Sequence, residues 1–385
     1  LNARPDLAEE ETQGKYTWLA LQKRAGGASL PEIELIDMAA GVRDERHTGL
    51  LSERLERAIG KRLEKGEQSI LFLNRRGFSN FLLCLSCKTA IRCPHCDVVM
   101  TWHKSIGSLM CHFCGEQQPK PDKCPECETP DPAPMGAGTQ RIEEDVSKAF
   151  PEARVLRIDL DTTRGKHGFL RLWEQIERGD ADVMLGTQMI SKGLHLERVT
   201  LVGVVSADHS LFLPDFRAAE RAFAQLTQVA GRAGRMADRG GEVIIQTFVP
   251  HHYAIQRAIR HDVEGFWERE LHMRQMLRFP PYWRLLLVRV SGEDRDKVRS
   301  RATRLGALLK EIQFKRQEYR HLGILGPVPC PIEKLQDKIR WQIVIRGQSP
   351  AKMRALVQAG LKIYDKDKGR AGVHLTLDMD PLDLL

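Results

Sequence analysis

Eight cysteines gather in four Cys-x-x-Cys pairs within a short stretch of the chain. The pairs are Cys84/Cys87, Cys93/Cys96, Cys111/Cys114 and Cys124/Cys127. Two intervening residues let both sulfurs of a pair reach one metal ion from a single tight turn. Eight thiolates supply two tetrahedral four-cysteine sites with none left over, so the spacing predicts two bound Zn²⁺ ions.

The linker lengths predict which pairs share an ion. Fourteen residues separate Cys96 from Cys111, close to the loop of a four-cysteine zinc ribbon, so the two central pairs should hold one ion. The first and last pairs then share the other ion in a nested arrangement. Both sites should be structural, because four thiolates leave no open coordination position for an activated water molecule.

Other side chains near the cysteines have weaker signals. His95 and His112 lie inside cysteine pairs, and we expect them at the surface or supporting the ligands, because the thiolates already satisfy two ions. Trp102 and Phe113 have two interpretations, contact with exposed bases or a partner protein, or ordinary packing inside the module. The ninth cysteine, Cys330, is expected to be a buried, inert thiol.

Composition narrows the class of protein. The chain has 385 residues, which favours two or three domains, and its 42% hydrophobic and 29% charged residues are typical of a soluble globular protein. Apolar runs are too short for a membrane span, and no targeting segment is visible. A net charge of +8 favours a polyanionic partner. The metal-type cysteine spacing favours a reducing cytosol, and the start at Leu1 suggests a piece of a longer protein.

Strands alternate with helices over the first 250 residues, which predicts a parallel sheet covered on both faces and interrupted by the cysteine insertion. We expect strands at 32–37, 69–73, 155–158, 182–187, 199–205 and 242–248, and helices at 51–63, 139–150, 168–177 and 218–230. A helical link covers 251–274. Beyond the Phe279-Pro280-Pro281-Tyr282 break, the order βαββαβ predicts a ferredoxin-like α+β domain, with strands at 285–291, 324–329, 339–346 and 373–379 and helices at 295–312 and 350–363.

Two further motifs have residue types suited to phosphate chemistry. The first is Gln228-Val-Ala-Gly231-Arg232-Ala-Gly234-Arg235, in which glycines allow close backbone approach and two arginines present fork-shaped cations. The second is Gly186-Thr187-Gln188-Met-Ile-Ser-Lys192-Gly193-Leu-His195, which follows a buried strand. The basic run from Lys310 to Arg320 is either a solvated helix end or a contact for DNA phosphates.

Together the two motifs resemble motifs V and VI of the second RecA-like lobe of superfamily 2 helicases. Two further segments make the resemblance specific to one family of these helicases. They are Leu71-Phe-Leu-Asn-Arg-Arg-Gly-Phe78, which leads into the cysteine insertion, and Ser206-Ala-Asp-His-Ser-Leu-Phe-Leu-Pro-Asp-Phe-Arg-Ala-Ala-Glu-Arg221. Over nearly its whole length the chain resembles the PriA family of primosomal replication-restart helicases. The domains implied are 1–50 as a linker or the start of the second helicase lobe, 51–83 with 129–250 as the second RecA-like helicase lobe, 84–128 as the zinc insertion, 251–283 as the helical link and 284–385 as a C-terminal DNA-binding domain.

The resemblance implies an ATP-dependent 3′→5′ DNA helicase, a hydrolase also classed as an isomerase, that acts in replication restart and primosome assembly. It implies catalytic roles for Gln228, Arg232 and Arg235, ATP contacts for Gly193, His195 and Gly231, and DNA contacts for Arg75, Thr187, Gln188 and Lys192. It also implies branched and single-stranded DNA, single-strand-binding protein and primosome or helicase-loading proteins as partners. A cytoplasmic, nucleoid-associated bacterial monomer without membrane contact is expected.

One departure from the family pattern concerns ATP. No Gly-x-x-x-x-Gly-Lys-[Ser/Thr] loop occurs, and Asp44-Glu45-Arg46-His47 only imitates a metal-holding DExH box because no hydrophobic strand precedes it. ATP and Mg²⁺ should therefore bind only together with a first helicase lobe, and the isolated chain should not hydrolyse ATP. The alternatives are a non-hydrolysing scaffold that binds fork DNA and recruits primosome proteins, and an RNA-directed zinc protein on a RecA-like fold.

Overall fold

Contacts divide the chain into two compact units. The computed structural model describes residues 31–41, 50–73, 80–130, 132–135, 139–158, 168–186, 198–231, 241–364 and 372–384. The first unit contains Leu1–Arg76, Ala137–Leu211 and Ala219–Glu268, and the second contains Gly77–Gly136, Phe212–Ala218 and Arg269–Leu385. The cysteine-rich stretch thus belongs to the same unit as the C-terminal part of the chain.

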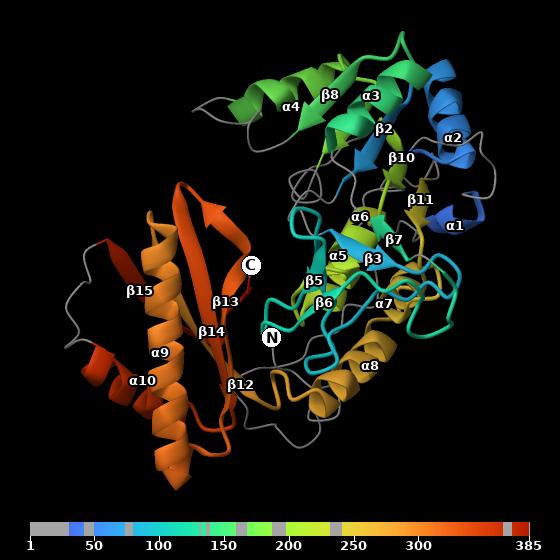
Figure 1. Ribbon diagram of the computed structural model, residues 1–385. Coiled ribbons are helices and arrows are strands. Elements are labelled where there is room, and N and C mark those ends of the chain that lie inside the picture. Colours follow the sequence, from blue (N-terminus) through green and yellow to red (C-terminus); the bar gives the residue numbers. More distant parts are fainter. Residues whose placement is uncertain are drawn as a thin grey trace, which may run out of the picture. The chain divides into compact units, whose positions relative to one another are not determined.

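The first unit is built on a six-stranded parallel sheet (Figure 1). Across the sheet the strands are β1 (Glu32–Asp37), β11 (Glu242–Thr247), β10 (Val199–Val204), β2 (Gln68–Phe72), β9 (Val183–Gly186) and β8 (Val155–Ile158). Every residue of β2, β9 and β10 is buried, which is the pattern of strands covered on both faces. The predicted parallel α/β sheet is confirmed.

Helices lie between these strands along the chain, and two more follow the last strand. The connecting helices are α1 (Met38–Gly41), α2 (Glu53–Glu64), α3 (Thr139–Ala149), α4 (Gly168–Arg178), α5 (Asp208–Leu211) and α6 (Ala218–Ala230), and α7 (Tyr253–Ile259) and α8 (Val263–Met276) follow β11. The amide of Leu55 donates to Ser52 Oγ at 3.3 Å, which caps the start of α2. Because apolar residues recur every four positions, α2 places Leu55 and Ile59 together in a core with Leu71 and Leu201 of the sheet.

The C-terminal part forms the predicted βαββαβ arrangement. Its antiparallel sheet has the order β13 (Gly323–Leu335), β14 (Lys338–Gly347), β12 (Arg284–Gly292) and β15 (Val373–Met379). Helices α9 (Arg295–Lys315) and α10 (Pro350–Tyr364) pack side by side on one face (Figure 1). The helices cross closely, since a Cβ added at Gly360 would lie 2.7 Å from Leu309 Cδ2.

The cysteine-rich stretch contains strands of only three residues. Strand β3 (Phe81–Leu83) pairs with β7 (Ala133–Met135), and β4 (Thr101–His103), β5 (Ser108–Met110) and β6 (Gln117–Pro119) form a small antiparallel sheet. The domain limits inferred from sequence place β3 with the helicase lobe, whereas in the structure it lies in the second unit. Among the described residues, no helix has the length and apolar character needed to cross a membrane.

Candidate metal centres

The four cysteine pairs lie on four turns of the same shape. In each turn, the residue that follows the second cysteine donates its amide hydrogen to the carbonyl oxygen of the first, at 2.7–2.9 Å. These residues are Lys88, Asp97, Gly115 and Glu128, and all four have positive φ, at 62°, 54°, 88° and 59°. The left-handed residue turns the chain back within one step, so the two sulfurs of a pair can approach the same point.

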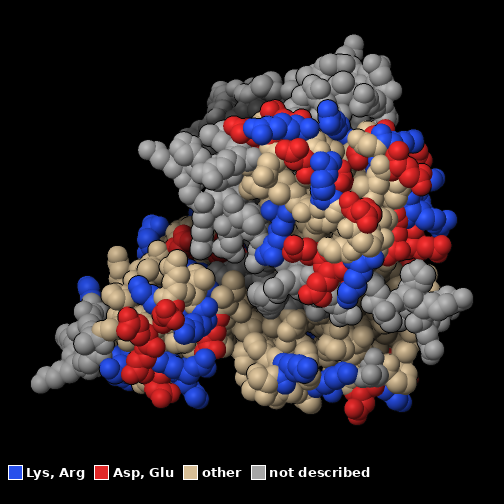
Figure 2. Space-filling view, turned by 90° about the horizontal axis from the view of Figure 1, so that it is seen from above, with Lys and Arg blue, Asp and Glu red and all other residues tan. Residues whose placement is uncertain are grey.

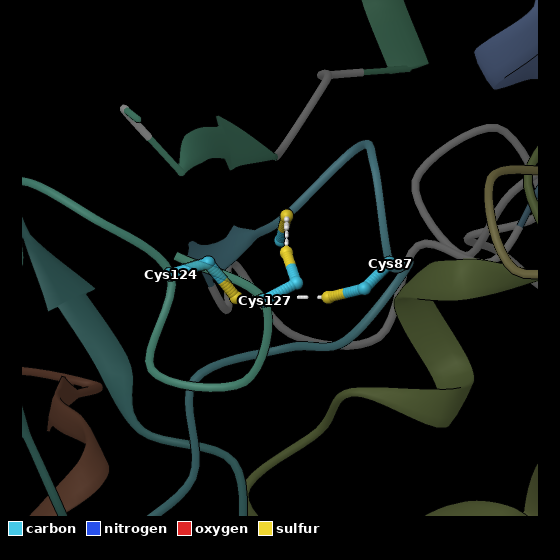
Figure 3. Close-up of side chains that lie close together, drawn as sticks. Cys87, Cys124 and Cys127 are labelled. Atoms are coloured by element: carbon cyan, nitrogen blue, oxygen red, sulfur yellow. Dashed lines mark hydrogen bonds between the residues drawn. The ribbon is translucent and has the colours of Figure 1, made fainter. Parts of the chain in front are cut away.

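The sulfurs gather into two groups, each with its atoms within 4.8 Å of one another. One group is Cys93, Cys96, Cys111 and Cys114, named here the inner site, and the other is Cys84, Cys87, Cys124 and Cys127, named the outer site (Figure 3). This nested grouping agrees with the expectation from the linker lengths. Sulfur pairs Cys84/Cys127, Cys87/Cys124 and Cys93/Cys114 are each 3.6 Å apart, near the ~3.8 Å edge of a tetrahedron with 2.3 Å zinc–sulfur bonds.

The electrostatics of the thiols also fit a divalent cation. A hydrogen bond between Cys93 and Cys111 lowers the pKa of Cys93 and raises the pKa of Cys111. Four sulfurs this close cannot all ionise without a compensating charge. Zn²⁺ provides that charge and matches the tetrahedral all-sulfur donor set, so the residues fit the ion.

The two sites differ in burial. Cys93, Cys96 and Cys111 are buried and Cys114 is half-buried, whereas the outer site includes the exposed Cys127. Figure 3 shows Cys87, Cys124 and Cys127 of the outer site with their side chains directed toward one another. Hydrogen bonds between Cys127 and Thr129 lower the pKa of the Cys127 thiol to about 6, which favours the thiolate that a metal needs.

Neither histidine joins a sulfur group among the described residues. His95 is exposed, and its Nε2 lies 3.3 Å from a carboxylate oxygen of Glu116. His112 is buried, with Nδ1 at 3.0 Å from the carbonyl oxygen of Pro329 and Nε2 at 3.1 Å from His103 Nε2. Burial lowers the pKa of His112 to about 4, so the ring is neutral near pH 7.

The aromatic residues of the module pack inside the second unit. Phe113 is 1% exposed and Trp102 is partly buried against the same core. This favours the packing interpretation over stacking on exposed bases. Cys330 is fully buried, and burial raises the pKa of its thiol, as expected for an inert residue.

Most residues assigned to nucleotide and DNA contacts lie outside the described residues. These are Arg75, Thr187, Gln188, Lys192, Gly193, His195, Arg232 and Arg235. Gln228 is exposed near the end of α6, and the amide of Gly231 donates to the carbonyl oxygen of Thr227 at 3.1 Å. Asp44–His47, the imitation of a DExH box, also lies outside the described residues.

The strands nevertheless determine where two of these segments start. Strands β2 and β9 are parallel neighbours, with Phe72 opposite Gly186 at their carboxyl ends. The amide of Leu73 donates to the carbonyl oxygen of Gly186 at 2.8 Å. The segments containing Arg75 and Thr187 therefore begin at the same edge of the sheet, where ligands commonly bind in open α/β folds.

A buried carboxyl group, Asp208, was given no role by the sequence. It is 2% exposed, and it accepts hydrogen bonds from Thr247 Oγ1 at 2.7 Å and from the amide of Phe248 at 3.1 Å. Burial raises its pKa to about 6. An aspartate in a Ser-Ala-Asp-His segment has no local pattern that distinguishes it from a surface residue, so only its tertiary contacts identify it.

Family models match two parts of the chain. The Primosomal protein N C-terminal domain matches residues 275–382, and the PriA DNA helicase Cys-rich region domain matches residues 93–119. With the parallel sheet and the two four-cysteine groups, these matches define a protein that has a parallel α/β lobe, a cysteine-rich insertion of the PriA type and an α+β C-terminal domain of the primosomal protein N type.

Similarity to curated proteins extends over almost the whole chain. It is 41% identical to the replication restart protein PriA of Bacillus subtilis over 96% of this chain and 45% of that protein. Identity is 40% with PriA of Treponema pallidum, over 97% of this chain and 54% of that protein. The chain is thus similar to PriA proteins over nearly its whole length, and it spans about half the length of the relatives that it matches.

Solved structures with partial likeness include two helicase structures. The C-terminal domain of the DEAD-box protein Dbp5 is 14% identical, with a TM-score of 0.29, over 60% of this chain and 84% of that chain. Mycobacterium smegmatis helicase Lhr bound to ssDNA and AMP-PNP is 13% identical, with a TM-score of 0.31, over 61% of this chain and 22% of that chain. Likeness at this level supports no conclusion about function.

Proposed function

We propose that the chain is the second lobe, zinc module and C-terminal domain of an ATP-dependent 3′→5′ DNA helicase that acts in replication restart at stalled or branched forks. The observation that carries the proposal is the match to PriA proteins at 36–41% identity over about 96% of the chain, across both units. Single-strand-binding protein and primosome or helicase-loading proteins are the proposed partners of a cytoplasmic monomer.

ATP and Mg²⁺ would bind between this lobe and a first lobe that carries the phosphate loop. Arg232 and Arg235 follow α6 and would stabilise negative charge on the transferred phosphoryl group, with Gln228 positioned one turn earlier. Gly193, His195 and Gly231 would line the nucleotide side. A DNA strand would be contacted by Arg75, Thr187, Gln188 and Lys192. Their segments start at the carboxyl ends of β2 and β9, and the pairing of these two strands supports a shared DNA contact.

Two Zn²⁺ ions would occupy the inner and outer sites in structural roles. Each ion would supply the charge that lets four thiolates remain ionised, and it would fix the turns that carry them. The four thiolates complete the coordination sphere, so no step of ATP hydrolysis is assigned to the metal.

The C-terminal domain is proposed to bind DNA through the face formed by α9 and α10. Helix α9 carries seven Lys and Arg residues against two acidic ones, and α10 carries three against none. Phe314 is 78% exposed and lies between Lys310 and Lys315. Cations next to an exposed aromatic ring suit single-stranded DNA, whose phosphates they neutralise and whose bases can stack. On the face drawn in Figure 2, by contrast, acidic and basic side chains interleave.

The proposal is tested with the full-length protein, ATP and a synthetic fork. We expect DNA-stimulated ATP hydrolysis and unwinding that begins from a 3′ single-stranded arm. Fork binding without either activity would instead support the scaffold alternative, and a preference for RNA would support the RNA-directed alternative. Fork substrates with either arm replaced by RNA distinguish these outcomes.

A further inference from the structure

The sheet of the C-terminal domain is covered on both faces. Alternation along β12 directs Leu286 and Val288 into the core beneath α9 and α10, and Leu285 and Leu287 into a second core on the opposite face. A sheet with helices on only one face would leave that second face open to water. The cysteine-rich module covers it.

Three ligands of the inner site are members of this second core. The core joins residues of the cysteine module with residues of β12, β14 and the C-terminal tail, namely Leu82, Ile91, Cys93, Cys96, Val98, Met100, Leu109, Cys111, Phe113, Phe279, Leu285, Leu287, Val344 and Leu384. All of these side chains are at most 6% exposed. The inner site therefore lies within an apolar core that spans both parts of the second unit.

The turn between Cys111 and Cys114 makes the polar contacts of this interface. Gln342 Nε2 on β14 donates to the carbonyl oxygen of His112 at 2.9 Å, and His112 Nδ1 lies 3.0 Å from the carbonyl oxygen of Pro329 on β13. Phe113 packs edge-on against Phe279, with ring centroids 6.0 Å apart. The two residues between the ligands Cys111 and Cys114 thus make the contacts with β13, β14 and Phe279.

At Gly115, this turn lies close to the C-terminal sheet. A Cβ at Gly115 would lie 2.8 Å from Val328 Cγ1. The equivalent positions of the other three turns hold Lys88, Asp97 and Glu128, also with positive φ. The turn itself tolerates a side chain, so the contact with β13 is what requires glycine here.

Among the residues that the structure describes, the outer site shows none of these connections. None of its four cysteines is a member of the apolar cores found there, and Cys127 is exposed. Its described partners are its own turns and Thr129, which follows Cys127 by two residues.

We propose that the two zinc sites have different structural roles. The inner site holds the cysteine module against β12, β13 and β14, so its metal stabilises the C-terminal domain as well as the module. The outer site stabilises only the loops that carry it. This inference rests on the zinc occupancy proposed above.

The test compares two buried ligands by substitution in the full-length protein, Cys111→Ser for the inner site and Cys124→Ser for the outer site. Each variant should lose one of two zinc ions. Cys111→Ser should speed amide hydrogen exchange in β12 and β14 by roughly tenfold or more, whereas Cys124→Ser should leave it unchanged. Equal effects of the two variants, or no effect of Cys111→Ser, would overturn the inference.

A reciprocal experiment leaves all eight ligands in place and remains informative if Cys111→Ser does not fold. Gln342→Ala removes the donor to the His112 carbonyl and should accelerate release of one zinc ion to a chromophoric chelator by about 5- to 100-fold. The control is Gln313→Ala, which removes an amide that donates to the carbonyl oxygen of Leu322 on the helix-covered side. Release unchanged by Gln342→Ala would contradict the inference.

Failure of the inference and failure of the proposed function give different results. Wild-type protein purified without chelator should contain two zinc ions per chain. Fewer than two would contradict the proposed zinc sites themselves. If the protein contains two zinc ions and loss of either one has the same effect on β12 and β14, only the proposed difference between the inner and outer sites would be contradicted.

Discussion

At the scale of single residues, the sequence predicted the role of a side chain where its spacing from its neighbours was enough to indicate that role. The cysteine pairs are four repetitions of one local turn, so their grouping could be inferred from linker lengths. His112, Gln342 and Asp208 could not be found this way, because their roles depend on partners 217, 230 and 39 residues away. Contacts of that kind are set by tertiary packing and leave no local pattern.

Asp208 provides a prediction on the pH dependence of stability. Its pKa in the folded chain is raised to about 6 by burial, from 3.8, so the folded state binds more protons than the unfolded state between these values. Burial of the neutral carboxyl group therefore contributes to the stability of the first unit at low pH. The free energy of unfolding should fall by roughly 3 kcal/mol as pH rises from about 4 to about 6. Asp208→Asn should remove this decline while it keeps an acceptor for Thr247.

Hydrogen exchange of the β11 amides between pH 4 and pH 7 measures the effect, after correction for intrinsic exchange rates. Asp180→Asn serves as the control, because Asp180 is exposed in the loop before β9. An Asp208→Asn profile that is parallel to the wild-type profile would show that burial of this carboxyl group does not limit stability.

At the scale of elements, the sequence predicted segments that have a clear period or clear breakers. Strands β8 and β15 and helix α6 have the predicted limits, whereas β13 extends from Gly323 to Leu335, beyond the predicted 324–329. The three-residue strands β3 to β7 show no period. Turn geometry and neighbouring cysteines determine them, so the sequence predicted their module but not their pairing.

The helical face of the C-terminal domain provides a prediction on DNA binding. Phe314→Ala in the full-length protein should weaken binding to a single-stranded oligonucleotide by about 5- to 100-fold, the range for loss of one stacked base. Lys310→Ala should instead reduce the salt dependence of log K by about 0.7, the value for one phosphate contact. Fluorescence anisotropy across a salt series measures both effects.

The matched control for Phe314 is Leu382→Ala, because Leu382 is an apolar side chain with 83% exposure that does not lie on α9 or α10. It should bind like the wild type. Unchanged affinity in Phe314→Ala, or a loss equal to that of Leu382→Ala, would exclude base stacking at this position.

At the scale of the whole molecule, the chain combines a parallel α/β unit with a unit in which the cysteine module and the C-terminal domain share a core. The sequence predicted the three parts, since each has its own pattern of cysteines, strands or helices. It did not predict that two of them form one compact unit. That association depends on the apolar face of β12, whose alternation shows that a face is buried but not what covers it.

The central claim is that this lobe completes the ATP site of a PriA-type helicase. Arg235→Ala in the full-length protein tests it most directly, by steady-state ATP hydrolysis with fork DNA and by fork affinity in parallel. Loss of an arginine that stabilises transition-state charge should slow hydrolysis by roughly 10³-fold or more. Salt-sensitive fork binding should persist, because other cations still neutralise phosphates. Near-normal hydrolysis in Arg235→Ala would contradict the account.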